Sequence, residues 1–468
     1  MNQEYTPVML ENRTYEELKV GDSASLIRTL TKDDIDAFAI LSGDVNPAHL
    51  DDAYAKETPF QKVIAHGMWG GTLISTVLGT QLPGPGTIYV GQHMRFMRPV
   101  SLGDTITVTL TVKEKKDKNM VVLECNCTNQ NGKPVIVGEA EIMAPTVKVR
   151  RAQAPLPQMH LHRLERFDQL LSLVKGLPAM RCAVVFPEDA ATLKAALNAA
   201  HEGLIMPVLI GCRERISALG QQLNLDLLEC LWREAESPAH AASIAVEMAR
   251  DGEVAAIMQG SIPVHVLMQK ALRHAGGLRT TRRVSHAYLA DVPNYPQPVM
   301  ITDAEVNVRP SLDDRRDIVQ NAIDLAHLLK FAAPRVAVLS AAEDFNSNLD
   351  SSTTAAVLCK MHERGNITGA LVDGPMTFDA AVRPDVAHVK YPNSPVAGQA
   401  NILMVPNLEA ANMLVKQLGH FAHADIAGIV LGAKVPIMLI NPIDTPRTRL
   451  ATSAMARLVA HSCPKATA

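Results

Sequence analysis

The sequence predicts an α+β domain followed by an α/β domain, and three observations favour this division. The chain has 468 residues, more than a single hydrophobic core ordinarily serves. Up to residue 146 the pattern indicates helices and then a run of strands, whereas from residue 166 short apolar runs alternate with long helical stretches. The segment between them is basic, with two prolines and no clean apolar period. We therefore predict domains over residues 10–146 and 166–468, joined by a linker over 147–165.

The composition argues against several classes of partner. Hydrophobic residues make up 47% of the chain and charged residues 20%, which is typical of a globular protein in water. The formal net charge of -3 gives no polybasic surface, so we expect no binding to nucleic acid or to an anionic membrane. No apolar run is long enough to span a bilayer, and the polar N-terminal segment does not resemble a secretory signal. We expect a cytoplasmic protein.

The seven cysteines predict neither a disulfide framework nor a metal site. They are scattered along the chain, and the close pair Cys125 and Cys127 falls in an expected strand, with no second pair at zinc spacing. We therefore expect reduced, buried thiols and no bound metal ion.

In the N-terminal half, the segment TKDDIDAFAILSG predicts a helix that ends just before a loop. Thr31 is a good N-cap, and Asp34 has the position of a capping-box acid. Gly43 is a suitable residue to end the helix. The apolar face recurs at helical spacing through Ile35, Phe38 and Ala39. Asp44 is therefore expected on a loop immediately after this helix.

The next six residues, DVNPAH, place a histidine close to that aspartate. Asn46 is a good N-cap and Pro47 suits a first helical position, so His49 is expected in the first turn of a short helix. The partial positive charge at such a helix end disfavours imidazolium, and a neutral histidine is what a general base requires. Asp44 and His49 could then share one water molecule. Taken alone, the hexapeptide favours an ordinary loop-to-helix transition with a surface histidine.

A second segment, VIAHGMWGGTLISTVLGTQL, predicts a long, nearly all-apolar helix of the kind that is buried against a sheet. Gly67 lies at its start, where a backbone N–H can point at a ligand oxygen and polarise a thioester carbonyl. The alternative for His66-Gly67 is a tight entry to a buried helix without a chemical role. Strands are expected over residues 88–97, 104–112, 120–127 and 134–144, with Asn131-Gly132 as a hairpin turn.

Together these segments carry a resemblance to a known family. SGDVNPAHLD, AHGMWGGTL and MRFMRPVSLGDTITV, in this order, resemble the MaoC-like, (R)-specific enoyl-CoA hydratases over residues 10–145. The resemblance implies a hot-dog fold, Asp44 and His49 as the catalytic pair, and the Gly67 amide as oxyanion donor. It also implies an enoyl-CoA substrate, with coenzyme A entering as part of the acyl-CoA thioester and no separate cofactor.

The C-terminal half predicts an α/β domain whose polar residues follow its strands. Helices are expected over 189–202 and 408–418, and strands over 182–186, 208–210, 255–258, 336–339, 369–372, 402–405 and 437–440. Ligands of such sheets bind beyond the carboxyl ends of the strands, where Asp373, Asn407, Asn441 and Asp444 are expected. Each of these residues is also consistent with ordinary turn and cap chemistry.

The C-terminal half resembles the phosphate acetyl/butyryltransferase family over residues 165–468. The carrying segments are RRVSHAYLADVP, MITDAEVNVRP, QNAIDLAHLL, PRVAVLSAAE, DGPMTFDAA, NILMVPNLEAANMLVKQL and AGIVLGAKVPIMLI. The resemblance implies a two-subdomain α/β fold with coenzyme A in the cleft, acetyl phosphate or phosphate as a second ligand, and Asp444 as the base for the CoA thiol.

Three family motifs are altered in this chain. The usual Ser-Arg before Asp444 is Asn441-Pro442, so a charged phosphate ligand is replaced by proline. The usual Lys-Gly with His-Thr reads QGSIP over 259–263, and the usual Gly-Asp-Ala-Asp reads GQAN over 398–401. The remaining candidates for holding phosphate are Arg279, Arg282 and Arg283, which are equally consistent with a solvated basic turn.

These observations leave three functional hypotheses. In the first, the N-terminal domain hydrates trans-2-enoyl-CoA to (R)-3-hydroxyacyl-CoA, and the C-terminal domain only binds coenzyme A or assembles the oligomer. In the second, the C-terminal half also interconverts acyl-CoA plus phosphate with acyl phosphate plus CoA. In the third, neither half is catalytic, against which the intact Asp44, His49 and Gly67 argue. The altered motifs favour the first hypothesis, and both resemblances imply a homo-oligomer.

Overall fold

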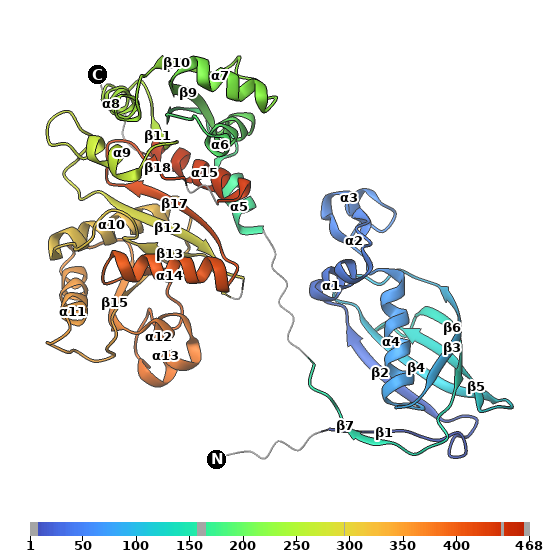
Figure 1. Ribbon diagram of the computed structural model, residues 1–468. Helices are drawn as coiled ribbons and strands as arrows, with labels where there is room; N and C mark the ends of the chain where they lie inside the picture. Colours follow the sequence, from blue (N-terminus) through green and yellow to red (C-terminus); the bar gives the residue numbers. More distant parts are fainter. Residues whose placement is uncertain (1–7, 157–164, 294, 441–443, 463–468) are drawn as a thin grey trace. The chain divides into compact units, whose positions relative to one another are not determined.

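The computed structural model describes residues 8–156, 165–293, 295–440 and 444–462. The chain forms two compact units, Met1–Leu161 and His162–Ala468 (Figure 1). The smaller unit is α+β and the larger is α/β, so both predicted fold classes are confirmed. No helix among the described residues is long and apolar enough to cross a membrane.

The smaller unit is built on a five-stranded antiparallel sheet. Its strands run in the order β2 (Ser23–Thr29), β4 (Thr105–Lys115), β5 (Met120–Thr128), β6 (Pro134–Met143) and β3 (Ile88–Phe96). The alternation in β4 buries every second residue, so one face of the sheet carries the core. The helix α4 (Gly67–Thr80) packs on that face, which is the predicted hot-dog arrangement.

The buried face of α4 fixes how closely helix and sheet approach. Its buried side chains are Trp69, Leu73, Ile74, Val77 and Leu78. They pack against Val108, Leu110, Leu123 and Ile136 of the sheet in one hydrophobic cluster. A Cβ added at Gly70 would lie 2.3 Å from Ile136 Cδ1, so this approach depends on glycine.

Three short helices precede α4: α1 (Lys32–Ser42), α2 (Pro47–Leu50) and α3 (Asp52–Glu57). The predicted capping box is present, with the Thr31 side chain bonded to the Asp34 amide and the Asp34 carboxylate bonded to the Thr31 amide. Gly43 ends α1 in the left-handed conformation, with φ of 73°. The predicted cap of α2 is also present, since Asn46 Oδ1 accepts from the Ala48 amide.

A two-stranded antiparallel sheet pairs β1 (Met9–Glu11) with β7 (Arg150–Ala152), and β7 lies inside the stretch predicted as linker. Charge complementarity explains the pairing in part, because Lys148 forms ion pairs with Glu11 and Glu17. Hydrophobic periodicity in the sequence does not reveal such a strand, because three residues are too few to show an alternation.

The larger unit contains one eleven-stranded mixed sheet. Its order is β10 (Leu231–Glu234), β9 (Ile205–Gly211), β8 (Met180–Val185), β11 (Ala256–Gln259), β18 (Ile437–Met438), β17 (Asp425–Leu431), β12 (Ser285–Asp291), β13 (Val299–Thr302), β16 (Ile402–Met404), β14 (Arg335–Leu339) and β15 (Leu371–Met376). The strands from β10 to β18 are parallel to one another, as are those from β13 to β15. The antiparallel pair β17 and β12 joins the two blocks.

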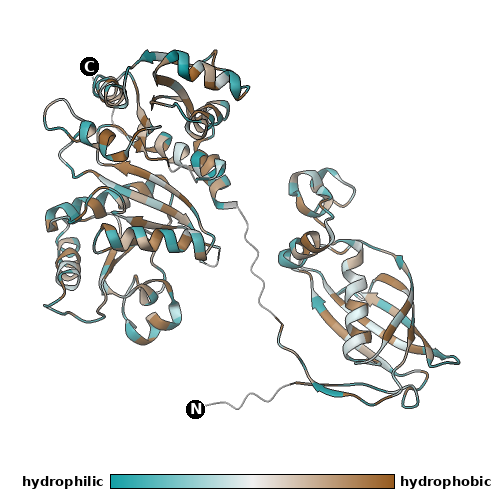
Figure 2. Cartoon of the chain, viewed as in Figure 1, coloured by the Kyte–Doolittle hydropathy of each residue, from teal (hydrophilic) through white to brown (hydrophobic). Residues whose placement is uncertain are grey.

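Helices cover both faces of this sheet, and apolar residues are concentrated on its strands (Figure 2). They are α5 (Glu165–Val174), α6 (Ala190–His201), α7 (Arg213–Gln222), α8 (Pro238–Arg250), α9 (Val264–Ala271), α10 (Leu312–Leu328), α11 (Asp350–Glu363), α12 (Phe378–Val382), α13 (Pro384–Lys390), α14 (Leu408–Phe421) and α15 (Pro446–Ser462). Residues on β12 alternate between faces, so Leu289 packs in the cluster with α10 whereas Tyr288 packs in the cluster with α14.

The strands expected in the larger unit are found within a few residues of their predicted bounds, but β10, β12, β13 and β17 were not predicted. In the smaller unit β2 was missed for a similar reason. It is largely exposed, so hydrophobic alternation is weak along SASLIRT.

We expect Gly138→Ala to destabilise the smaller unit, because an added Cβ would lie 1.9 Å from the His93 carbonyl oxygen on the neighbouring strand. Overpacking of this kind costs about 1–3 kcal/mol of unfolding free energy. The measurement is urea unfolding followed by Trp69 fluorescence in a Trp232→Phe background. The matched control is Gly79→Ala, whose Cβ meets no atom within 4 Å and which should stabilise α4 slightly. Equal midpoints for the two variants would contradict this packing.

Candidate active site

The loop between α1 and α2 presents Asp44 to solvent. Its Oδ1 accepts a hydrogen bond of 3.2 Å from the Asn46 amide, and its own amide donates to Ser42 Oγ, also at 3.2 Å. These bonds fix the carboxylate beside the first turn of α2 while leaving the residue exposed. Asp44 therefore lies on the loop where the sequence predicted it.

His49 is buried in this turn, and a backbone carbonyl defines which of its ring nitrogens donates. Its Nδ1 lies 2.9 Å from the Ile64 carbonyl oxygen. Because a carbonyl oxygen only accepts, Nδ1 carries a hydrogen, and the tautomer that this contact selects has Nε2 as its hydrogen-bond acceptor. The helix α2 has only four residues. The Ile64 carbonyl, more than the helix dipole expected from the sequence, therefore orients the His49 ring.

His66 is a residue of this site that the sequence analysis left without a role. Its Nε2 lies 3.0 Å from the backbone oxygen of Asp44, so it donates to the loop that carries the aspartate. Its Nδ1 is buried without a hydrogen-bond partner among the described residues. The ring lies against that of His49, with centroids 4.0 Å apart. His66 thus ties the Asp44 loop to the start of α4, a contact across 22 positions that no local pattern reports.

Together these three residues form the polar centre of the smaller unit. A carboxylate oxygen of Asp44 and one nitrogen each of His49 and His66 all lie within 4.8 Å of one another. Two imidazoles and a carboxylate are ligand types that zinc accepts, so the chemistry of the donors would suit a cation as well as a water molecule. Cysteine spacing, from which no metal was predicted, cannot report this group, since none of its three donors is a cysteine.

An apolar cavity of about 340 Å³ adjoins this centre. His49 and Gly67 both line it, together with Phe60, Ile64, Trp69, Phe96, Met97 and Val100. Gly67 is the first residue of α4, and the first amides of a helix lack intrahelical acceptors. An added Cβ at Gly67 would lie 3.3 Å from the Phe96 ring. The cavity can therefore hold an acyl chain with its carbonyl oxygen near a backbone donor and its chain near a histidine base.

The larger unit has a cavity of about 500 Å³ beneath α14. Asp444, the predicted base, lines it, and so does Gln259, the first residue of an altered motif. The implied base and the altered motif thus reach the same cavity although they are far apart in sequence.

The same cavity contains a polar pair that the sequence analysis missed. The Tyr288 hydroxyl lies 3.0 Å from Glu305 Oε1, and both residues line the cavity. Burial raises the pKa of Tyr288, and burial also raises the pKa of Glu305 although the Tyr288 hydrogen bond opposes that rise. Tyr288 is on β12, a strand that was not predicted, so its inward direction could not be derived from the sequence.

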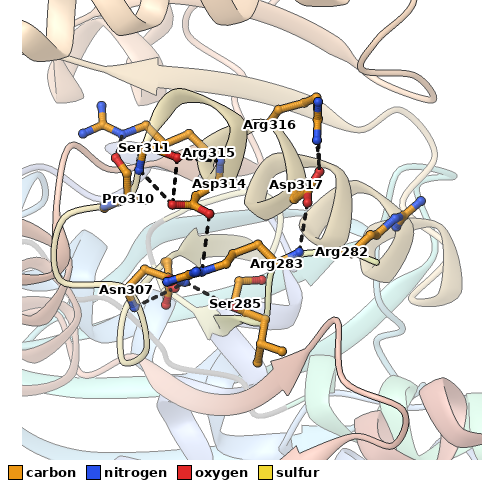
Figure 3. A network of polar contacts seen from close by, with 12 residues as sticks. Arg282, Arg283, Ser285, Asn307, Pro310, Ser311, Asp314, Arg315, Arg316 and Asp317 are labelled. Carbon is orange, nitrogen blue, oxygen red and sulfur yellow. Dashed lines mark hydrogen bonds and ion pairs between the residues drawn. The ribbon is translucent and has the colours of Figure 1, made fainter. Parts of the chain in front are cut away.

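Figure 3 shows that Arg283 is part of a network of polar contacts with residues of α10 and the loop before it. Arg283 Nε donates to Asn307 Oδ1 at 2.7 Å and lies 3.5 Å from the Asp314 carboxylate. Arg282 forms an ion pair with Asp324 on α10. Carboxylates therefore hold both guanidinium groups where the sequence had allowed a phosphate site.

The other predicted residues of the transferase-like site lie elsewhere. Arg279 is exposed, and its backbone bridges to Ala433. Asp373 is on β15 at the edge of the sheet, where it accepts from Ser394 Oγ and from the Gly374 amide. Neither residue lines the cavity of Asp444. Asn441 lies outside the described residues. Asn401, from another altered motif, is buried and bonds the Arg335 amide at 2.7 Å, which is a structural role.

Comparison with protein families divides the chain in the same way. The family described as phosphate acetyl/butaryl transferase matches residues 231–457, and the family described as MaoC like domain matches residues 19–130. The second match contains Asp44, His49, His66 and Gly67.

Curated relatives match the C-terminal part. A phosphate acetyltransferase from Rhizobium meliloti is 44% identical over 298 residues, covering 63% of this chain and 93% of that protein. A phosphate butyryltransferase from Clostridium beijerinckii is 32% identical over 296 residues, covering 63% of this chain and 98% of that protein.

Among solved structures, a branched-chain phosphotransacylase from Enterococcus faecalis is 26% identical, covers 60% of this chain and 99% of its own, and has a TM-score of 0.54. An R-hydratase from Pseudomonas aeruginosa in the unliganded form is 49% identical, covering 33% of this chain and 99% of its own, with a TM-score of 0.32.

Proposed function

This chain belongs to the phosphate acetyl/butyryltransferase family and carries a MaoC-like domain ahead of it, and from that premise we propose that the N-terminal domain hydrates trans-2-enoyl-CoA to (R)-3-hydroxyacyl-CoA. The observation that carries the proposal is the contact of His49 Nδ1–H with the Ile64 carbonyl oxygen, which leaves Nε2 as the ring atom that can accept a proton, with Asp44 close by.

In the proposed reaction, water adds across the double bond between C2 and C3 of the acyl chain. Asp44 and His49 hold the water and take its proton as the oxygen attacks C3. Negative charge develops on the thioester oxygen, where the Gly67 amide stabilises it. The same pair then returns a proton to C2, so the atoms of one water molecule are added and nothing is oxidised or reduced.

We expect Asp44→Asn to lower kcat for crotonyl-CoA hydration by about 10²–10⁴, because an amide cannot take the proton from water. The asparagine side chain can still accept from the Asn46 amide, so the loop should retain its conformation. The measurement is loss of enoyl-thioester absorbance. A wild-type chain without hydratase activity on any enoyl chain length would refute the proposal.

A matched pair at Gly67 tests the oxyanion donor. Gly67→Pro removes the amide hydrogen at a first helical position, where proline is tolerated, and His66 already has φ of -57° and ψ of 134°, as a residue before proline requires. This variant should lose about 10²–10³ in kcat. Gly67→Ala places a Cβ against the same Phe96 ring but keeps the amide donor, so its kcat should fall much less. Equal losses would assign the effect to crowding.

The proposal extends to self-association of the chain, because β3 is an edge strand of its sheet with large apolar residues in water. Ile88, Val90 and Phe96 are more than half exposed, at 57%, 53% and 55%. An apolar edge of this kind is protected by pairing with another copy. We expect light scattering to give at least a dimer, and Val90→Lys to shift the mass downwards, with Lys113→Ala as a surface control. A wild-type monomer at micromolar concentration would contradict this.

A second candidate function is acyl transfer between coenzyme A and phosphate in the C-terminal domain. The relatives named phosphate acetyltransferase and phosphate butyryltransferase favour it, and Asp444 in the cavity beneath α14 is consistent with it. Two observations argue against a fast reaction. Proline stands at position 442 in place of arginine, and acidic side chains pair with Arg282 and Arg283.

We therefore expect slow formation of acetyl-CoA from acetyl phosphate and CoA. Losing charge-assisted bonds to phosphate costs roughly 1.5–3 kcal/mol each, and Pro442→Arg should raise the phosphate affinity. The measurement is thioester absorbance with varied acetyl phosphate, and Pro442→Ala is the control without a charge. Robust turnover by the wild type would establish a bifunctional enzyme and overturn the expectation of a weak transferase.

A further inference from the structure

The cavity beneath α14 has the wrong charge for a site that binds only anions. Glu305, Asp425 and Asp444 line it, whereas Lys416 is the only lysine or arginine among its described lining residues. Carboxylates this close to a bound anion oppose it, since like charges are costly at low dielectric. The groups in this cavity instead favour a neutral ligand part that donates hydrogen bonds.

Two buried acceptors that line the cavity have no donor among the described residues. Gln259 is 7% exposed, and its Nε2 donates to the Ile262 carbonyl at 2.8 Å, which fixes the amide and leaves Oε1 without a hydrogen-bond partner in the described part of the chain. Asp425 Oδ2 is likewise buried, with no partner from residues 8–156, 165–293, 295–440 or 444–462. Buried acceptors without donors are rare in folded proteins, and a bound ligand is one source of the missing donor.

The Tyr288 and Glu305 pair adds a further polar surface to the same cavity. The tyrosine hydroxyl donates to Glu305 at 3.0 Å, so its oxygen can still accept from a ligand. An unsubstituted acyl chain has no hydrogen-bond donor and would leave these acceptors desolvated. A hydroxyl group on the acyl chain would supply one.

We propose that the cavity beneath α14 accepts the acyl group of a 3-hydroxyacyl thioester, so that the C-terminal domain prefers the hydroxylated acyl chain over the unsubstituted one. The inference rests on the proposed functions: the hydratase supplies the hydroxyl, and the transferase candidate supplies the reaction. In that reaction a phosphate oxygen bonds to the acyl carbon, the carbon–sulfur bond breaks, and the CoA sulfur receives the proton from phosphate. The products are a 3-hydroxyacyl phosphate and free CoA.

The test uses the full chain with Asp44→Asn, which prevents conversion of the hydroxyacyl thioester to the enoyl thioester. Phosphate-dependent release of CoA is measured with (R)-3-hydroxybutyryl-CoA and with butyryl-CoA. We expect kcat/KM to be roughly tenfold higher for the hydroxylated substrate, because its hydroxyl group supplies the donor that the buried acceptors need. Gln259→Met, which keeps the side-chain length and removes the acceptor, should bring the ratio to within about threefold of unity.

The matched control is Gln221→Met on the exposed surface of α7, which should leave the ratio as it is. A preference for butyryl-CoA, or a ratio that Gln259→Met does not change, would overturn the inference.

If neither thioester releases CoA, the transferase candidate fails, and binding decides the inference separately. Calorimetry then compares both thioesters on the Asp44→Asn chain with and without Gln259→Met. The N-terminal site contributes equally to both chains. The inference is supported if Gln259→Met weakens the binding of the hydroxylated thioester and leaves the binding of the unsubstituted thioester unchanged. It is refuted if the chains with and without Gln259→Met bind the hydroxylated thioester equally.

Discussion

The approach of α4 to its sheet is close enough that Gly70 can carry no Cβ without displacing Ile136, and the smaller unit depends on that approach. The packed helix brings Gly67 to the edge of an apolar cavity and His66 to the backbone of the Asp44 loop. Two carbonyl oxygens, those of Asp44 and Ile64, then determine which nitrogen of each histidine carries hydrogen. The backbone thus orients both rings in the way that the proposed proton transfers require.

In the larger unit the corresponding constraint lies at the centre of the sheet. The antiparallel strands β17 and β12 join two parallel blocks, and a Cβ at Gly428 would lie 2.6 Å from the Tyr288 ring and 2.7 Å from the His286 ring. The absence of that side chain leaves room for both rings, one of which reaches the cavity beneath α14. Burial lowers the pKa of His286 to about 3, so the ring is neutral and packs as an apolar group.

The sequence was sufficient to predict features that short stretches of chain determine. The capping box of α1, the left-handed Gly43, the Asn46 cap and the apolar α4 were all predicted, because each depends on residues within one or two turns. The two fold classes were predicted from the change along the chain, from helices followed by a run of strands to short apolar runs that alternate with helices.

What could not be predicted depends on contacts between distant segments. His66 meets Asp44 and Tyr288 meets Glu305 only because the fold brings the strands and helices together. The basic turn at Arg282 and Arg283 was equally consistent with a phosphate site, and the acids of α10 that pair with both residues are not their neighbours in sequence. Exposed strands such as β2 and very short ones such as β7 carry too little alternation to be recognised.

The exposed apolar edge of β3 has a consequence for the other half of the chain. Because the two units are one polypeptide, any pairing of two copies through β3 also tethers two transferase-family units. Their effective concentration would then be set by the length of chain between the units and no longer by the amount of protein in solution. The two kinds of unit stay in a one-to-one ratio at any dilution because they share one polypeptide, whereas two transferase-family units stay close together only at concentrations that preserve the pairing.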